Sequence, residues 1–155
     1  MLVEALDADF VALIEGRAPR GLTLADGGVG PPAVLEMLRG LAGTIRPGFA
    51  PAAWMIVRDG EIVGLCSVVK PPAGGSVDIG YGIADSRQKR GFASLAVGEV
   101  LDWARGDDRV AIVTAETSID NPASQRVLER NGFHRIGTRD DDEDGALICW
   151  SAAVG

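Results

Sequence analysis

Residues 88–94 read Gln88-Lys89-Arg90-Gly91-Phe92-Ala93-Ser94 and separate an expected strand from an expected helix. The small residues Gly91 and Ala93 let backbone N–H groups approach a ligand closely. The first N–H groups of a helix have no partner within it, and the helix dipole adds partial positive charge there. The segment therefore predicts a binding site for an anion, such as a phosphate, at the start of this helix.

Basic side chains surround this segment in a chain that is otherwise acidic. Arg87, Lys89 and Arg90 lie close together, whereas the whole chain has a formal net charge of −7. Clustered cations strengthen the attraction for a phosphate group. The alternative is a tight turn with a solvated basic face, and the segment alone leaves both interpretations open.

The regions on either side of this segment predict a strand, a helix and a second strand. Residues 77–83 alternate apolar residues with polar or small ones, as an antiparallel strand does. Residues 92–104 are apolar on nearly all sides, which predicts a largely buried helix. Residues 110–115 are a continuous apolar run, typical of a central strand covered on both faces.

The first half of the chain predicts two helices and then a hairpin. Residues 3–16 carry apolar residues at helical spacing, and the prolines at 31 and 32 open a second helix that runs to residue 45. Residues 53–57 and 62–69 are strand-like and are joined by a two-residue Asp59-Gly60 turn.

The last part of the chain predicts one helix and a final strand pair. Asn121 and Pro122 are a helix cap and a first-turn proline, and Asn131-Gly132 ends that helix. Residues 133–137 and 146–151 are strand-like and are joined by an acidic loop at 140–144. Since there is no repeat and no linker, residues 1–155 are expected to form one mixed α/β domain.

The composition argues against several classes of protein. The acidic balance disfavours a nucleic-acid partner. The chain has one histidine, and its two cysteines are not in CxxC spacing, so no metal site is expected. No apolar run approaches the length of a membrane span, and early acidic residues argue against a signal peptide. Cys66 and Cys149 lie in apolar runs and are expected to be buried free thiols, so the sequence predicts a cytoplasmic protein.

Three motifs, in this order along the chain, resemble the GNAT acetyltransferase superfamily. Residues 77–83, Val-Asp-Ile-Gly-Tyr-Gly-Ile, are similar to the fourth strand of the family. The Gln-x-x-Gly-x-Ala pattern from Gln88 to Ala93 resembles the turn that binds the CoA pyrophosphate. Residues 121–133, Asn-x-x-Ser ending in Gly-Phe, resemble the second motif. The match is nearest to the ribosomal-protein N-terminal acetyltransferases; residues 1–50 show no specific match, and residues 21–24 are the best candidate for the first strand.

The resemblance implies a mixed sheet that splays between the strands at 77–83 and 110–116, with CoA in the gap. It implies transfer of an acetyl group from acetyl-CoA to a primary amine, on a small molecule or a protein N-terminus. The CoA contacts that it implies are Ile83, Gln88, Lys89, Arg90, Gly91, Phe92, Ala93, Ser94, Asn121 and Ser124.

Acetyl transfer to an amine also requires a base and a proton for the departing sulfur. Asp78 is the first candidate base, because its position resembles that of the catalytic glutamate in some family members. Glu116, at the end of the next strand, is the second, and the alternative for each is a solvated charge. Many family members have a tyrosine where this chain has Leu128. Ser124, one turn earlier, is therefore the candidate proton donor, and a bond to its own helix is the alternative.

Two other functions stay open at this point. A non-catalytic acyl-CoA-binding module would keep the anion site without turnover. A dinucleotide-binding oxidoreductase needs GxGxxG after a first strand, and the Gly80-Tyr81-Gly82 run lacks the third glycine. The acidic run at 140–144 is either a solvated loop or an attraction for a cationic amine. The sequence fixes neither the acceptor nor whether the chain forms a homodimer.

Overall fold

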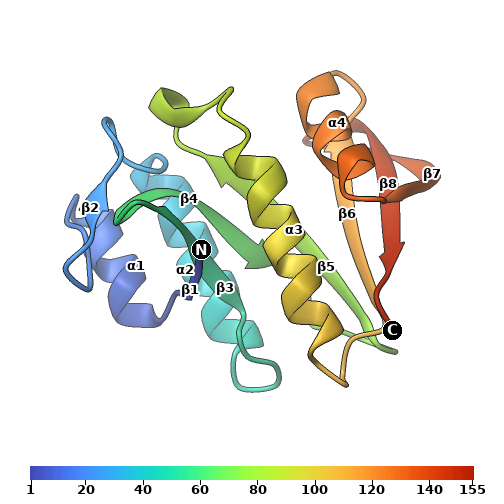
Figure 1. Ribbon diagram of the computed structural model, residues 1–155, viewed down its shortest axis with the longest axis horizontal. Helices are drawn as coiled ribbons and strands as arrows, with labels where there is room; N and C mark the ends of the chain where they lie inside the picture. Colours follow the sequence, from blue (N-terminus) through green and yellow to red (C-terminus); the bar gives the residue numbers. More distant parts are fainter.

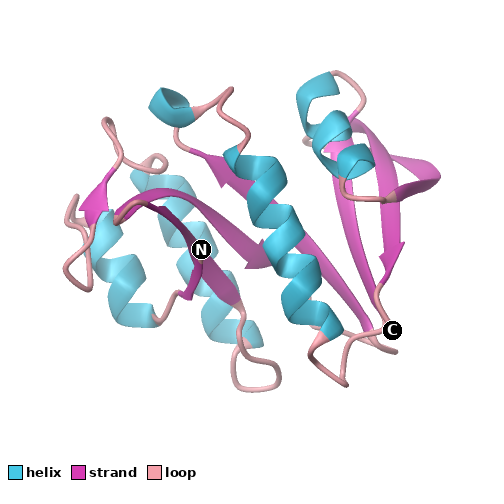
Figure 2. Ribbon diagram, viewed as in Figure 1, coloured by secondary structure: helices cyan, strands magenta, loops and turns pink.

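The computed structural model describes residues 1–155, which form an eight-stranded sheet with flanking helices (Figure 1, Figure 2). The sheet order is β1-β3-β4-β5-β6-β8-β7, and β2 lies beside β4. This mixed architecture confirms the predicted α/β fold class. The elements in chain order are β1 (Leu2–Glu4), α1 (Asp7–Ile14), β2 (Thr23–Leu24), α2 (Pro32–Ile45), β3 (Ala53–Arg58), β4 (Glu61–Val68), β5 (Ser76–Ile83), the short 3-10 helix η1 (Asp85–Arg87), α3 (Phe92–Arg105), β6 (Ile112–Ser118), α4 (Pro122–Arg130), β7 (His134–Asp141) and β8 (Gly145–Ala153).

The neighbouring strands β5 and β6 are parallel and separate part-way along their length. Ser76 to Ile79 of β5 pair with Ile112 to Ala115 of β6. Beyond this point β5 continues alongside β4 to Ile83, whereas β6 continues alongside β8. A gap therefore opens between β5 and β6 at their carboxyl ends, where open α/β sheets bind their ligands.

Helices cover the two faces of the sheet unequally. Figure 1 shows α2 behind β4 and α3 in front of β5, and both helices contact those strands. On β6, Val113 and Ala115 are buried in a core that includes Val97 of α3 and Leu128 of α4. The intervening residues of β6 are half-buried or exposed. One face of β6 is therefore packed beneath helices, and the other face is open.

The N-terminal region differs from the expectation in two respects. The helix expected over residues 3–16 begins only at Asp7, because Leu2–Glu4 forms β1 and pairs antiparallel with β3. The first strand expected at residues 21–24 is wrong, since only Thr23–Leu24 is extended, as the short β2 beside β4. A strand of three residues is too short for its alternation to stand out from helical spacing. The second helix, Pro32–Ile45, and the β3–β4 hairpin lie where they were predicted.

Four details of the second half also differ from the expectation. Leu95 is 56% exposed, so α3 is not buried on all sides. The central strand β6 is covered on one face only, and Cys149 is partly exposed, which leaves Cys66 as the buried thiol. Asp140 and Asp141 lie within β7 rather than in the loop. An apolar composition shows which side chains could be buried, but not how much helix covers them.

Candidate active site

The turn before α3 presents free backbone N–H groups. Gly91 is the N-cap residue of α3 with φ of 79°, and no side chain caps the helix. The first N–H groups of α3 therefore have no partner within the helix. A side chain at Gly91 would be strained at this φ, although an added Cβ would meet no atom within 4 Å. The backbone conformation thus requires glycine, and the space in front of it is open.

A cavity of about 510 Å³ lies in front of this turn. Its wall comes from the end of β5, the turn with the first residues of α3, and α4. Arg90 does not line the cavity, but all the other residues expected to contact CoA do. These are Ile83, Gln88, Lys89, Gly91, Phe92, Ala93, Ser94, Asn121 and Ser124. The fold therefore gathers two separate sequence motifs around one space.

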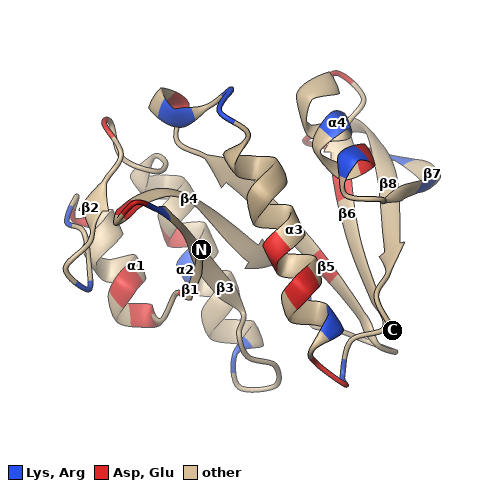
Figure 3. Cartoon of the chain, in the orientation of Figure 1, with Lys and Arg blue, Asp and Glu red and all other residues tan.

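The cavity is bordered by cations that have no acidic partner. Lys89, Arg126 and Arg130 line it and make no ion pair. Figure 3 shows basic residues on the turn before α3 and on α4. Arg87 instead bonds to both carboxylate oxygens of Glu61, at 2.6 and 3.0 Å, which neutralises its charge. Arg126 and Arg130 were not among the residues expected at the site, although a spacing of four on a helix places both on one face.

Two hydroxyl groups meet in the wall of the cavity. Asn121 caps α4 through its Oδ1, which accepts a hydrogen bond from the Ser124 N–H at 3.1 Å. The Ser124 Oγ lies 3.0 Å from the Tyr81 hydroxyl, which also donates to the Ser124 carbonyl at 3.4 Å. Burial raises the pKa of Tyr81, and its hydrogen bond with Ser124 opposes that rise. The phenol is therefore protonated at neutral pH. No sequence signal pointed to this contact between residues 43 positions apart.

The end of β5 leaves backbone groups unpaired on the side of the gap. Gly80 to Ile83 pair with β4 on one edge and with no strand on the other. The Gln88 side chain donates to the Ile83 carbonyl at 3.2 Å, which ties the turn to the end of β5. A Cβ added at Gly82 would meet no atom within 4 Å. The gap therefore has both free backbone groups and space beside the cavity.

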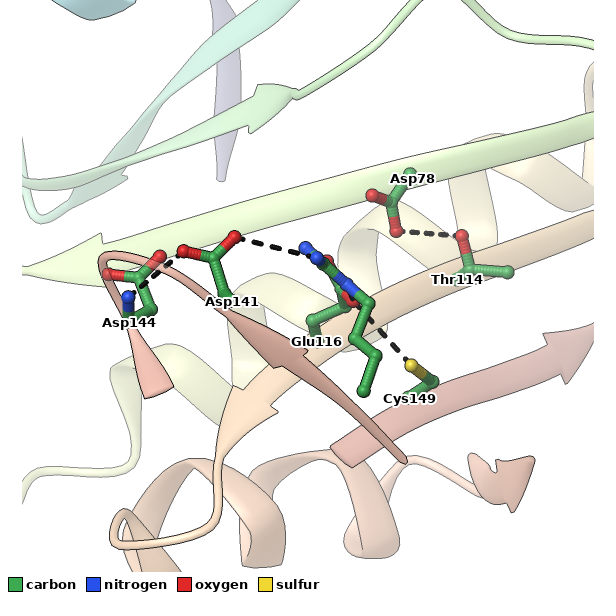
Figure 4. A network of polar contacts seen from close by, with 7 residues as sticks. Asp78, Thr114, Glu116, Asp141, Asp144 and Cys149 are labelled. Carbon is green, nitrogen blue, oxygen red and sulfur yellow. Dashed lines mark hydrogen bonds and ion pairs between the residues drawn. The ribbon is translucent and has the colours of Figure 1, made fainter. Parts of the chain in front are cut away.

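Asp78 lies on the face of β5 opposite Tyr81 and the cavity, because side chains alternate along a strand. It is only 7% exposed, and its Oδ1 accepts a hydrogen bond of 2.7 Å from the Thr114 hydroxyl of β6 (Figure 4). No cation pairs with it. A nearly buried carboxylate is thus held beside the gap without a neutralising partner.

Glu116 shares this face with Asp78, but it has a cationic partner. Arg139 of β7 bonds to both oxygens of Glu116, one of them at 2.9 Å, and it contacts Asp141 at 3.4 Å. This pairing lowers the pKa of Glu116 and makes it a weaker base. The Cys149 thiol donates to the same carboxylate at 3.5 Å (Figure 4). Of the two carboxylates, only Glu116 has a cationic partner, and neither lines the cavity.

None of the helices combines the length and the apolar character needed to cross a membrane. The His, Cys, Asp and Glu side chains form no group of three that could hold a metal ion. The single histidine, His134, is exposed at the start of β7.

Comparison with known proteins agrees with this geometry. Residues 30–134 match the family model described as "Acetyltransferase (GNAT) domain". The chain is 32% identical over 84 residues to the uncharacterized N-acetyltransferase YjdG of Bacillus subtilis, an alignment that covers 52% of this chain and 50% of YjdG. It is 28% identical over 81 residues to the ribosomal-protein-serine acetyltransferase of Escherichia coli, covering 52% of this chain and 45% of that protein. The chain thus spans about half the length of the curated relatives that it matches.

Solved structures show the same fold at low sequence identity. RimL, a ribosomal L7/L12 alpha-N-protein acetyltransferase in complex with coenzyme A, aligns with a TM-score of 0.75 and 19% identity over 99% of this chain and 93% of that one. The aminoglycoside acetyltransferase AAC(6')-Ib in complex with coenzyme A aligns with a TM-score of 0.69 and 17% identity, over 99% and 94%. Because the family model covers more than half of the residues, the chain belongs to the GNAT acetyltransferase family.

Proposed function

We propose that this chain is an acetyl-CoA-dependent N-acetyltransferase that moves an acetyl group to a primary amine by direct attack on the thioester. The observation that carries the proposal is the cavity at the open N-terminus of α3, which adjoins the gap between β5 and β6. A phosphate-binding turn beside a splayed pair of strands fits a long ligand that carries a pyrophosphate at one end.

The residues present fit the pyrophosphate of CoA. The backbone of the turn and the first N–H groups of α3 face the cavity, and Gly91 leaves the approach open. The unpaired charges of Lys89, Arg126 and Arg130 add attraction for phosphate oxygens. The backbone of Ile83, which pairs with no strand on the side of the gap, is the proposed contact for the thioester end.

The proposed roles on either face of the gap account for the protons of the reaction. Acetyl-CoA supplies an activated acetyl group; a C–N bond forms, the C–S bond breaks, and the attacking amine loses one proton. Asp78 accepts that proton, directly or through a water, from the open face of the sheet. Ser124 donates a hydrogen bond to the departing sulfur from the cavity side. Glu116 is the weaker candidate base because Arg139 occupies both of its oxygens.

The acceptor is proposed to be a cation that approaches the open face of the sheet. Asp78, Glu116 and Asp141 line that face with a single arginine among them. The net charge of −7 adds a long-range attraction for an amine. Similar folds bear the names of a protein N-terminal acetyltransferase and an aminoglycoside acetyltransferase. Protein N-termini and aminoglycosides are therefore both candidate acceptors.

We place this activity in a single domain at residues 1–155 and in the cytoplasm. Cys66 and Cys149 are free thiols, which fits a reducing compartment. Activity in a cytosolic fraction that contains the tagged protein, and its absence from membrane and secreted fractions, would support the location.

The proposal is tested by mass spectrometry of products from a panel of small amines and peptides incubated with acetyl-CoA. A gain of one acetyl group on an amine nitrogen, faster than without protein, supports it. If acetyl-CoA binds but no acceptor in the panel is acetylated in a single turnover, the chain is instead an acyl-CoA-binding module.

A further inference from the structure

Tyr81 of β5 and Ser124 of α4 form a contact at the level where β5 and β6 have separated. Tyr81 lies beyond Ile79, the last residue of β5 that pairs with β6, so no backbone ladder holds the strands together there. The Tyr81 hydroxyl nevertheless reaches the Ser124 Oγ at 3.0 Å, and both residues line the cavity. The chain contains no other tyrosine.

The Tyr81 hydroxyl lies near two oxygens of Ser124, the carbonyl oxygen and the Oγ. The Ser124 carbonyl lies 3.4 Å from the Tyr81 hydroxyl and can only accept a hydrogen bond, so the phenol O–H points toward Ser124. In the closer contact, with the Ser124 Oγ at 3.0 Å, either hydroxyl group can be the donor. When the phenol shares its hydrogen with both oxygens of Ser124, the hydrogen of the Ser124 hydroxyl is free to point into the cavity.

Ser124 does not use its hydroxyl within its own helix. A serine in a helix often donates to the carbonyl of the preceding turn, but the only contact of the Ser124 Oγ is with Tyr81. The Ser124 N–H bonds to the cap residue Asn121, which leaves the side chain independent of the cap. Tyr81 is therefore the one group that can select the direction of the Ser124 hydroxyl.

We propose that Tyr81 is a positioning residue for Ser124: its hydroxyl donates to the Ser124 Oγ and so aims the Ser124 O–H at the departing sulfur. This role rests on the proposed acetyl transfer and adds a residue from β5 to the site. Tyr81 acts through Ser124 and does not itself protonate the sulfur. A hydroxyl group that is held in one direction spends less time in orientations from which it cannot bond to the sulfur.

A double-mutant cycle separates this role from direct proton donation. Single-turnover rates are measured for Tyr81→Phe, Ser124→Ala and the double variant, together with their affinities for CoA. We expect losses of about 5–50-fold for Tyr81→Phe and about 10–100-fold for Ser124→Ala. The double variant should be no slower than Ser124→Ala, because Tyr81 has nothing left to orient. CoA affinity should stay within about twofold throughout.

A rate for Tyr81→Phe within twofold of the parent, or losses that multiply in the double variant, would overturn the positioning role. Thr44→Val is the matched control, since the Thr44 hydroxyl bonds to its own helix at the Gly40 carbonyl. Its rate should equal that of the parent. An inactive parent would instead overturn the proposed acetyl transfer.

Because the chain has a single tyrosine, the hydrogen bond of Tyr81 can also be measured without turnover. Protein labelled with ¹³C at the tyrosine Cζ gives one signal, whose shift reports on the phenol hydrogen bond. Ser124→Ala should move this signal in the free protein, and Thr44→Val should not. An unmoved signal in Ser124→Ala would show that the two hydroxyl groups are not bonded in solution, which would overturn the positioning role even for an active enzyme.

Discussion

Asp78 and Thr114 face each other across the parallel pair β5–β6, and the Thr114 hydroxyl donates to the Asp78 Oδ1 at 2.7 Å. The next pair, Ile79 with Ala115, is the last before the strands separate. The hydrogen bond therefore fixes a nearly buried carboxylate immediately below the gap. A side chain held in this way can accept a proton without first reorienting.

Replacement of this carboxylate should slow the chemical step. Asp78→Asn keeps an oxygen that can accept the Thr114 hydrogen bond, but it removes the base. We expect kcat to fall by about 10²–10⁴-fold, with unchanged affinity for acetyl-CoA. Glu116→Gln is the matched control on the same face, and we expect its rate to stay within about threefold of the parent. Steady-state kinetics with the best acceptor of the panel, and calorimetry with acetyl-CoA, make the comparison. Equal rates for Asp78→Asn and the parent would remove Asp78 from the mechanism.

The ion pair between Glu116 and Arg139 should make stability depend on pH. Arg139 holds the pKa of Glu116 below its ordinary value of 4.5. The pair therefore stabilises the fold above about pH 4.5, and its contribution is lost as the pH falls through the lower pKa of the folded state. Both side chains are partly exposed, so we expect Arg139→Gln to lower the free energy of unfolding only slightly at neutral pH.

Urea unfolding at about pH 7 and about pH 3 tests this dependence. The difference between the parent and Arg139→Gln should shrink at the lower pH, where Glu116 becomes protonated. Arg105→Gln serves as the control, because Arg105 pairs only with the exposed Asp102 on the surface of α3. A difference for Arg139→Gln that stays constant with pH would indicate that the arginine stabilises by packing alone.

The acidic hairpin between β7 and β8 should affect the capture of a cationic acceptor. Asp141 is left intact, because its carboxylate accepts hydrogen bonds from the N–H groups of Glu143 and Asp144 at 2.8 and 3.0 Å and shapes the turn. Neutralising Asp140, Asp142, Glu143 and Asp144 together should raise KM for a cationic amine and leave kcat nearly unchanged. The difference should shrink in high salt, because salt screens exposed charges.

The double variant Asp102→Asn/Asp108→Asn is a control. It removes negative charge near the carboxyl end of α3, which is far from the hairpin in sequence. Its KM should match that of the parent. If neutralising the hairpin leaves KM unchanged at low ionic strength, the hairpin is only a solvated turn.

The parts of the site that depend on local sequence could be predicted from it. The turn at residues 88–94 and the capped start of α4 are each specified by neighbouring residues, namely Gly91 with φ of 79° and Asn121 with its bond to the Ser124 N–H. The β3–β4 hairpin depends likewise on the adjacent Asp59 and Gly60. For these elements, short-range backbone preferences determine the structure.

The contacts that the sequence analysis missed join residues that are distant along the chain. Tyr81 reaches Ser124 across 43 residues, and Arg139 reaches Glu116 across 23. Each contact depends on strand order and on where two strands separate, which no local pattern records. Arg87 appeared to belong to the anion site, but Glu61 on β4 neutralises it. A run of basic residues cannot show which charges are already paired in the fold.

We propose that the N-terminal turn of α3 holds the pyrophosphate of acetyl-CoA, and Gly91→Glu tests this role. The substitution places bulk and negative charge where the phosphates are proposed to lie. Two variants separate this effect from backbone strain. Gly91→Ala adds a side chain at the same φ without charge, and Gly74→Glu adds the same charge at another glycine of positive φ, in the loop before the opposite end of β5.

Calorimetric titration with acetyl-CoA, on variants first shown by thermal unfolding to be folded, is the most direct measurement. We expect Gly91→Glu to bind at least about 100-fold more weakly than the parent, or about 2.7 kcal/mol. Gly74→Glu should bind as the parent does, and Gly91→Ala should lie between them. A folded Gly91→Glu variant that binds acetyl-CoA with the affinity of the parent would contradict the account.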